Sequence, residues 1–278
     1  CPRIHPPSLQ RLPKFQRSNP FYRPIAMTSR HQLLERFNTL LQPERFRDYG
    51  PNGLQVEGSD QVRKIVSGVT ASRALIEAAI NAKADAIFVH HGLFWRGQEG
   101  CVTGWMKQRL ALLLAHDINL FAYHLPLDAH PELGNNAQLG LKLGLSTQGR
   151  FGEQDLGFIG ESRAQPGYAN AGALAQRLEK ELNRPVTLVG PPEVAIKKIA
   201  WCTGGAQSYF EPAIAAGADV FITGEISEPQ AHYARECGVA YIACGHHASE
   251  RYGAPAVAGY IAAQLHLEHA FIDIPNPA

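Results

Sequence analysis

Two adjacent histidines follow a run of apolar residues in the stretch ADAIFVHHGLFWRG, residues 84–97. Two more segments place a carboxylate four residues after a histidine, as H-x3-D and H-x3-E. Imidazole and carboxylate groups are common ligands of divalent transition metals, and both can transfer protons. The three motifs therefore predict a metal site, with candidates at His90-His91, His124…Asp128 and His246-His247…Glu250.

A histidine taken alone is more often a surface or hydrogen-bonded residue than a metal ligand. We keep that interpretation for five of the histidines outside the motifs, namely His5, His31, His116, His266 and His269. For Asp128 and Glu250 the alternative is that they stabilise the starts of helices. Three motifs that all end predicted strands are harder to explain in that way, so we favour the metal site.

The motifs follow buried strands in an alternating pattern of strands and helices. Apolar runs at 85–90, 118–123 and 239–244 predict the strands, and amphipathic segments between them predict the helices. Such alternation is typical of an α/β fold with largely parallel pairing, in which ligands bind beyond the carboxyl ends of the strands.

Geometry along the chain suggests two ions rather than one. The side chains of His90 and His91 are expected on opposite sides of an extended strand. His246 and Glu250 share a face if they lie on one helical turn. Two such clusters that meet across an interface can hold two metals roughly 3.5–4 Å apart.

The chain also contains an internal repeat. Residues 68–91 align without a gap onto residues 202–225, at an offset of 134, with Asp85 recurring as Asp219. A second block aligns residues 119–128 onto 241–250 at an offset of 122, which places His124 on His246 and Asp128 on Glu250. The change of offset predicts 12 extra residues in the first copy.

We therefore predict an α/β fold of two similar halves, produced by internal duplication, with a metal cleft between them. The first half is expected at residues 27–146, a connecting segment at 147–196 and the second half at 197–278. Residues 1–26 are rich in proline and arginine and are expected to be a disordered or non-native leader. Ser29 and Gln32 have the spacing of a capping box, which predicts that a helix begins there.

Composition sets broad limits. The 278 residues carry a net charge of +1, which gives no general reason to expect binding to nucleic acid or to a membrane. Five cysteines without a CxxC pair indicate neither a disulfide framework nor a zinc ribbon, so reduced thiols and a cytoplasmic location are expected. No apolar run reaches the ~20 residues that a membrane helix needs.

Several segments together resemble the NIF-three-like family, whose members are labelled GTP cyclohydrolase I type 2 homologues. They include YGPNGLQVEG, ADAIFVHHGLFWRG, HLPLDAHPELGNNAQLG, DVFITGEISE, GHHASER and FIDIPNPA, and the resemblance spans residues 27–278. It implies a dinuclear site for two divalent cations, which zinc, iron, manganese or nickel could occupy, and a ring-shaped homohexamer. The family's five ligands fall on His90, His91, Asp128, His246 and Glu250, with Glu250 as the bridging carboxylate.

Other residues have two open interpretations each. His124 either orients Asp128 or contacts substrate, or else makes a strand-end hydrogen bond. His247 is a pocket candidate, and Glu225, which aligns with His91, either lines the cleft or is a charge at a helix entry. Glu132, Asn135 and Asn136 belong either to the site or to a loop and helix cap. The turn at 204–208 gives a weak signal for phosphate binding. Trp95 and Cys101 are expected either at the mouth of the cleft or at a subunit contact.

The function predicted from these features is hydrolysis of a nucleotide at a two-metal site, with His124 and Glu250 as catalytic candidates. The substrate is GTP, as the family label suggests, or a damaged or modified nucleotide. Arg96, Arg73 and Lys107 are candidates for phosphate contacts. The alternative is a metal-binding ring that acts as a scaffold or adaptor, linked to nucleic-acid maintenance.

Overall fold

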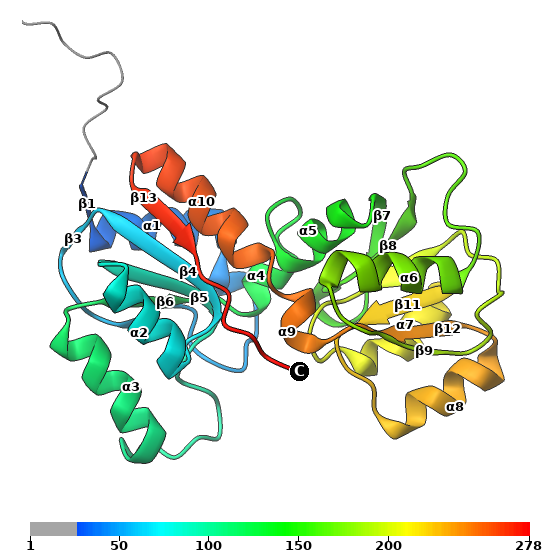
Figure 1. Ribbon diagram of the computed structural model, residues 1–278, viewed down its shortest axis with the longest axis horizontal. Helices are drawn as coiled ribbons and strands as arrows, with labels where there is room; N and C mark the ends of the chain where they lie inside the picture. Colours follow the sequence, from blue (N-terminus) through cyan, green and yellow to red (C-terminus); the bar gives the residue numbers. More distant parts are fainter. Residues whose placement is uncertain (1–26) are drawn as a thin grey trace, which may run out of the picture.

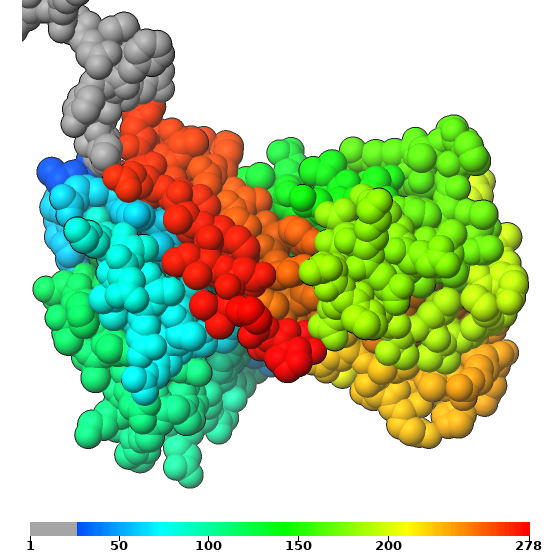
Figure 2. Space-filling view, viewed as in Figure 1, coloured from blue at the N-terminus to red at the C-terminus, as the bar shows by residue number. Residues whose placement is uncertain are grey.

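The structure is a computed structural model, and it describes residues 27–278. It has two lobes joined by a narrower waist (Figures 1 and 2). The leader predicted at 1–26 lies outside the described residues. In the described part of the chain, no helix is both long and apolar enough to cross a membrane.

The first lobe is built on a five-stranded sheet in the order β13-β4-β5-β6-β2. Its strands are β2 (Gly53–Val56), β4 (Lys64–Thr70), β5 (Ala86–His91), β6 (Asn119–Ala122) and β13 (Glu268–Phe271). Helices α1 (Arg30–Leu41) and α10 (Gly253–Leu265) pack on one face, and α2 (Arg73–Asn81) and α3 (Gly104–Ala115) pack on the other. The short strands β1 (Thr28–Ser29) and β3 (Gln61–Val62) pair beside it.

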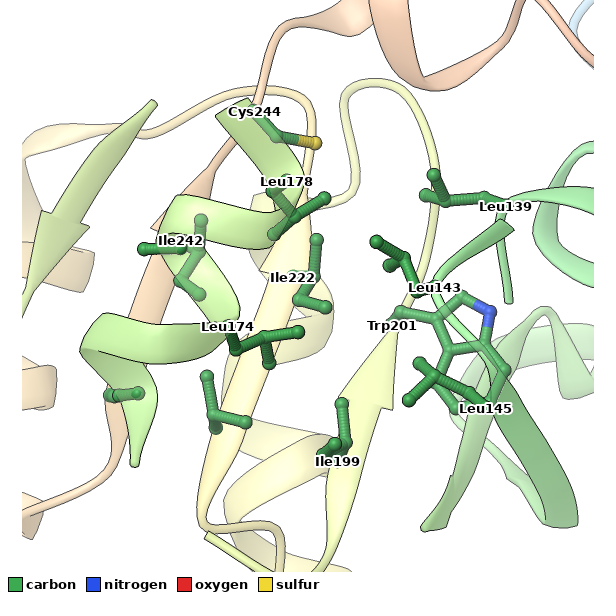
Figure 3. Packing of buried hydrophobic residues seen from close by; sticks show 14 of the residues in the cluster. Leu139, Leu143, Leu145, Leu174, Leu178, Ile199, Trp201, Ile222, Ile242 and Cys244 are labelled. Carbon is green, nitrogen blue, oxygen red and sulfur yellow. The ribbon is translucent and has the colours of Figure 1, made fainter. Parts of the chain in front are cut away.

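The second lobe is built on a six-stranded sheet in the order β7-β8-β10-β11-β12-β9. Its strands are β7 (Leu145–Phe151), β8 (Gly157–Ser162), β9 (Thr187–Val189), β10 (Ile199–Trp201), β11 (Val220–Thr223) and β12 (Ala240–Ala243). Helix α6 (Ala171–Leu182) covers one face, and α7 (Phe210–Ala215) and α8 (Glu228–Cys237) cover the other. Figure 3 shows Leu174 and Leu178 of α6 packed near Ile222 and Ile242 of the sheet.

Three short helices lie near the junction of the lobes: α4 (Leu125–Ala129), α5 (Asn135–Lys142) and α9 (His246–Ser249). Single 3₁₀ turns occur at Pro43–Arg45, Glu153–Asp155 and Gln207–Tyr209. Helix α1 begins at the predicted capping box: Ser29 Oγ accepts from Gln32 N, and the Gln32 side chain returns to the Ser29 backbone.

Both halves contain the same core of three parallel strands with an antiparallel strand at one edge. Strands β4, β5 and β6 correspond to β10, β11 and β12, and β2 and β9 are the edge strands. The predicted repeat of Asp85 and Asp219 is visible in the hydrogen bonds. Asp85 Oδ2 accepts from the backbone N–H groups of residues 63 and 64, and Asp219 Oδ2 accepts from those of residues 197 and 198, at the same offset of 134.

The second part of the repeat is shifted by one residue from the prediction. Val89 pairs with Ala122 and Thr223 pairs with Ala243, so the strands correspond at an offset of 243 − 122 = 121 rather than 122. His124 therefore corresponds to Gly245, which has a φ of 99° and begins the turn of α9. The alignment at an offset of 122 pairs His124 with His246, but the hydrogen-bonded pairing of the strands shows that the two halves correspond at an offset of 121.

The division between the halves also differs from the predicted ranges. Residues 147–196 do not only connect: they contain most of β7, all of β8 and β9, and α6, which are parts of the second lobe. Residues 253–271 return to the first lobe as α10 and β13. The reason is that the outer strands of each parallel core need hydrogen-bond partners, which these segments supply.

Candidate metal centre

His90 and His91 end strand β5 and lie side by side, with ring centroids 4.5 Å apart. The buried His90 ring is fixed because its Nδ1 lies 3.1 Å from the Tyr123 carbonyl oxygen, and His91 Nδ1 lies 3.1 Å from Thr70 Oγ1. Both Nε2 atoms therefore face the junction between the lobes. The expectation that the rings point to opposite sides is wrong, because both lean beyond the strand end toward Glu250.

Asp128 lies on α4, directly after strand β6, and is buried. Its Oδ1 atom accepts hydrogen bonds from Asn135 Nδ2 at 2.9 Å and from Thr203 Oγ1 at 3.3 Å. These bonds come from both sides of the junction and fix the direction of the carboxylate. The other oxygen, Oδ2, has no hydrogen bond to these two side chains.

Asn135 and Asn136 are both fully buried, and they support the centre rather than cap a helix. Asn136 Nδ2 donates to the backbone oxygen of Asp128, and its Oδ1 accepts from Thr203 N at 2.8 Å. Glu132 is exposed and lies outside the site. Sequence reasoning listed the two asparagines with Glu132, since nothing local separates a buried amide from a loop residue.

The second lobe contributes His246 and Glu250 from α9 and the residue after it. His246 Nε2 lies 3.3 Å from Glu250 Oε2, as expected for residues on one helical face. His246 Nδ1 lies 2.6 Å from Glu225 Oε1, so Glu225 holds the imidazole from behind. Of the two interpretations of Glu225, its contact with His246 favours a position at the metal centre over a charge at a helix entry.

Glu250 is the centre of the arrangement. It is 2% exposed, and imidazole nitrogens from three histidines surround it. Oε1 lies 3.3 Å from His90 Nε2, and Oε2 lies 3.3 Å from both His91 Nε2 and His246 Nε2. Donors bound to one tetrahedral ion at 2.0–2.1 Å are separated by about 3.3–3.4 Å. The observed spacing of 3.3 Å therefore fits donors around a divalent cation.

The donors form groups that overlap. His90, Asp128 and Glu250 form one group with ligand atoms within 4.8 Å of one another, and His91, His246 and Glu250 form another. His90, His91 and His124 form a third. His90 Nε2 and Glu250 Oε2 are buried without a hydrogen-bond partner of good geometry, which is costly unless something else satisfies them. The residues present thus fit a divalent metal.

Ionisation in the metal-free chain reflects this crowding. Burial lowers the pKa of His90, but the Asp128 and Glu250 carboxylates outweigh it and raise that pKa to about 10. Burial and the neighbouring imidazoles lower the pKa of His91 to about 3. Burial opposes ionisation of Glu250, yet His90 and His91 hold its pKa well below the usual range. Protons and cations therefore compete for the same positions.

His124 lies beside this group, with its ring centroid 4.9 Å from that of His90. Its Nδ1 is 2.7 Å from Asp48 Oδ1, which leaves Nε2 directed away from that carboxylate. Asp48 is itself held by Asn52 Nδ2 and Leu125 N. Sequence reasoning missed Asp48, and the only local signal is the turn Pro51-Asn52-Gly53 that follows it.

A cleft of about 190 Å³ opens onto the centre between the lobes. Residues from both lobes line it, including Tyr49, His124 and Asp128 from the first and Tyr209 and Glu250 from the second. Trp95 packs edge-on against His124 at 5.1 Å, near this cleft. The predicted cleft between the halves is therefore present.

Gly204 approaches Glu250 so closely that a side chain would not fit. Its φ is +73°, and an added Cβ would overlap Glu250 Oε1 and lie 3.2 Å from His246 Nε2. In the turn 204–208, Gly204 N donates to Ser249 Oγ and Ala206 N donates to Thr223 Oγ1. These bonds occupy two of the N–H groups that a phosphate would need.

The remaining candidates lie away from the cleft lining. His247 faces Asp273 on the other side of α9. Cys101 is exposed. Arg96 donates to the Asp48 carbonyl, Arg73 bonds Glu77 and Gln108, and Lys107 is exposed. Of the three predicted phosphate contacts, Arg96 is linked to the site through its bond to the Asp48 backbone.

Fold and site define an α/β protein of two similar halves with a candidate metal centre in the cleft between them. A family model described as Duf34/NIF3 (NGG1p interacting factor 3) matches residues 28–277. The chain belongs to this family, as the resemblance in the sequence indicates.

Relatives of similar length support the assignment. A protein of Neisseria meningitidis serogroup A named "GTP cyclohydrolase 1 type 2 homolog" is 51% identical over 252 residues, which is 91% of this chain and 100% of the relative. A protein of Pseudomonas aeruginosa with the same name is 50% identical over 251 residues, 88% of this chain and 97% of the relative. A solved structure described as "protein ybgI, unknown function" is 45% identical with a TM-score of 0.85, and covers 90% of this chain and 100% of its own.

Proposed function

We propose that this chain is a dinuclear, divalent-metal-dependent hydrolase that acts on a nucleotide. The observation that supports it most is the sharing of Glu250 between two donor groups, His90–Asp128–Glu250 and His91–His246–Glu250. A carboxylate between two sets of donors supplies the negative charge that two neighbouring cations require. Each lobe contributes donors, so the centre forms only when the lobes are packed together.

Two bound divalent cations would supply Lewis-acid polarisation of the substrate and a nucleophilic water at neutral pH. The residues of this chain have separate tasks around them. Asp128 is held in one orientation by Asn135 and Thr203. His124, fixed at Nδ1 by Asp48, is able to hold or transfer a proton at Nε2 beside the cleft. We assign catalytic roles to His124 and Glu250 on this basis.

The substrate class rests on the family label and on the cleft. The curated relatives are named as homologues of GTP cyclohydrolase 1 type 2, and a purine ring carbon would be the atom attacked in such a reaction. Tyr49 and Tyr209 at the cleft are suited to contact a planar base. GTP and damaged or modified nucleotides both fit this description. Imidazole and carboxylate donors suit zinc, iron, manganese and nickel alike.

The family description favours a second candidate. "NGG1p interacting factor 3" names a protein partner and not a reaction. The second candidate is therefore a metal-binding, ring-shaped scaffold or adaptor without catalysis, with a link to DNA maintenance. The two candidates differ in one respect that can be measured, namely metal-dependent turnover.

The test is a nucleotide screen on chain that has been stripped with a chelator and reloaded separately with Zn²⁺, Mn²⁺, Fe²⁺ or Ni²⁺. Product is followed by mass spectrometry and by loss of purine absorbance. A hydrolase gives product only after reloading, and Asp128→Asn abolishes it while Glu132→Gln, at an exposed position, does not. Absence of product with every nucleotide and metal, together with retained partner binding, would favour the scaffold.

The proposal includes a homo-oligomer, a hexameric ring in the cytoplasm, which the family resemblance supports. Sedimentation at micromolar concentration is expected to give a species larger than a dimer. A species near the 30.4 kDa of one chain would contradict the ring.

A further inference from the structure

Helix α9 carries His246 and leads into Glu250, yet it is only four residues long. A single helical turn is not stable by itself in water, so contacts with the rest of the protein must hold it. His246 and Glu250 face the candidate metal centre. The next residue after each of them, His247 and Arg251, contacts another part of the chain.

That part is the segment 272–278, which we call the C-terminal strap. His247 Nε2 lies 2.9 Å from Asp273 Oδ1, and Arg251 Nη1 lies 3.3 Å from Asp273 Oδ2. One carboxylate thus contacts both residues that follow the donors. The backbone N–H of His247 also donates to the backbone oxygen of Ala278 at 3.2 Å.

The strap starts from the first lobe. It continues β13, which pairs with β4, and Ile272 N donates to Ser67 O at 2.9 Å. Ile272 and Ile274 pack against the hydrophobic core formed by the first sheet with α2 and α3. The strap then crosses the waist to the second lobe (Figures 1 and 2), where Arg184 donates to the backbone oxygens of Pro277 and Ala278.

We propose that Asp273 is a positioning residue for the metal centre: the strap, anchored in the first lobe, holds α9 of the second lobe so that His246 and Glu250 face His90 and His91. An isolated surface ion pair would contribute little. Here the His247 side chain is 9% exposed, and the carboxylate is engaged at both oxygens. The inference rests on the proposed function because it takes these residues as metal ligands.

The experiment compares Asp273→Ala with Glu268→Ala, and it uses the full chain. Glu268 lies on β13 of the same C-terminal region, pairs with Lys64 at 3.6 Å and does not contact α9. Asp273→Asn, which keeps an acceptor for His247 but not a charge for Arg251, serves as a milder variant if Asp273→Ala does not fold. The first measurement is hydrogen exchange of the amides of residues 246–251 in metal-free protein. The second is titration with Zn²⁺ alone.

We expect exchange in 246–251 to rise about fivefold in Asp273→Ala and less in Asp273→Asn, with β12 unchanged. Zn²⁺ affinity should fall about tenfold. In Glu268→Ala neither quantity should change. Exchange in 246–251 that equals the Glu268→Ala control would overturn the proposal. A wild-type chain that binds no Zn²⁺ would instead contradict the proposed function, while the exchange measurement still decides the role of Asp273.

Discussion

Gly204 offers a direct test of the proposed metal centre, because a single added methyl group would collide with the Glu250 carboxylate. The Cβ of Gly204→Ala would overlap Glu250 Oε1 and lie 3.2 Å from His246 Nε2. Glu250 is buried, so its side chain has to rotate away from the three imidazoles around it. We expect the variant to lose high-affinity metal binding, with affinity lower by about 100-fold.

The stability cost has two parts. An alanine at a φ of +73° costs about 1 kcal/mol relative to glycine. Disrupting the buried Glu250 contacts in the metal-free chain adds about 3 kcal/mol. For a chain of this size, the sum of about 4 kcal/mol lowers the melting temperature by about 10 °C.

Gly238→Ala is the matched control. Gly238 ends α8 with a φ of +66° and has no atom within 4 Å of an added Cβ. Gly238→Ala therefore has the same backbone strain but no overlap with another residue. Its free energy of unfolding should fall by about 1 kcal/mol, and its metal affinity should not change. The assays are thermal unfolding of the metal-free proteins and metal titration of both variants. Metal affinity in Gly204→Ala equal to that in Gly238→Ala would refute the proposal that metal binds beside Glu250.

Three further outcomes follow from the same geometry. Asn135→Ala should lower the free energy of unfolding by about 1–3 kcal/mol, because it leaves buried Asp128 without its 2.9 Å hydrogen bond. Metal affinity should fall about tenfold, and unchanged melting and titration curves would contradict this. His124→Ala should keep nearly all its metal by elemental analysis but lose turnover, and loss of one ion would instead make His124 a ligand. Carboxylates near His90 and His246 raise their pKa values to about 10 and about 9 in the metal-free chain, so both imidazoles carry a proton at pH 7. Metal binding at pH 7 should therefore release about two protons, and metal affinity should fall at lower pH. Calorimetry in several buffers that detects no proton release would oppose this.

Much of the fold was predictable because it depends on local patterns. Apolar runs and amphipathic periodicity predicted the alternating strands and helices, and the capping box at Ser29 marked the start of α1. The repeated Asp85 and Asp219 are detectable in sequence because each makes the same pair of backbone hydrogen bonds in its own half. The motifs at strand ends predicted that His90 and His91 lie near Asp128, since the carboxyl ends of parallel strands share one edge of a sheet. The internal repeat predicted that the second cluster, with His246 and Glu250, faces the first across the cleft.

Other features depend on contacts between distant residues, so the sequence does not reveal them. Strand β7 alternates weakly in polarity, and only its pairing with β8 places it in the second sheet. Asp48 meets His124 across 76 residues, and Thr203 meets Asp128 across 75, with no periodic signal at either position. The second repeat block contains one extra residue near Gly245, which changes its offset along the chain. Sequence alignment does not detect this insertion, because an alignment shifted by one residue pairs His124 with His246 and so scores an identity.

The central claim is that Glu250 joins two cations, and counting ions per chain tests it most directly. Wild type and Glu250→Gln are loaded with the same metal, desalted in the same way and measured by elemental analysis. Glutamine keeps the shape but removes the negative charge that holds two cations together. We predict about two ions per chain for the wild type and one or fewer for Glu250→Gln. Two ions retained in Glu250→Gln, or none in the wild type, would contradict the account.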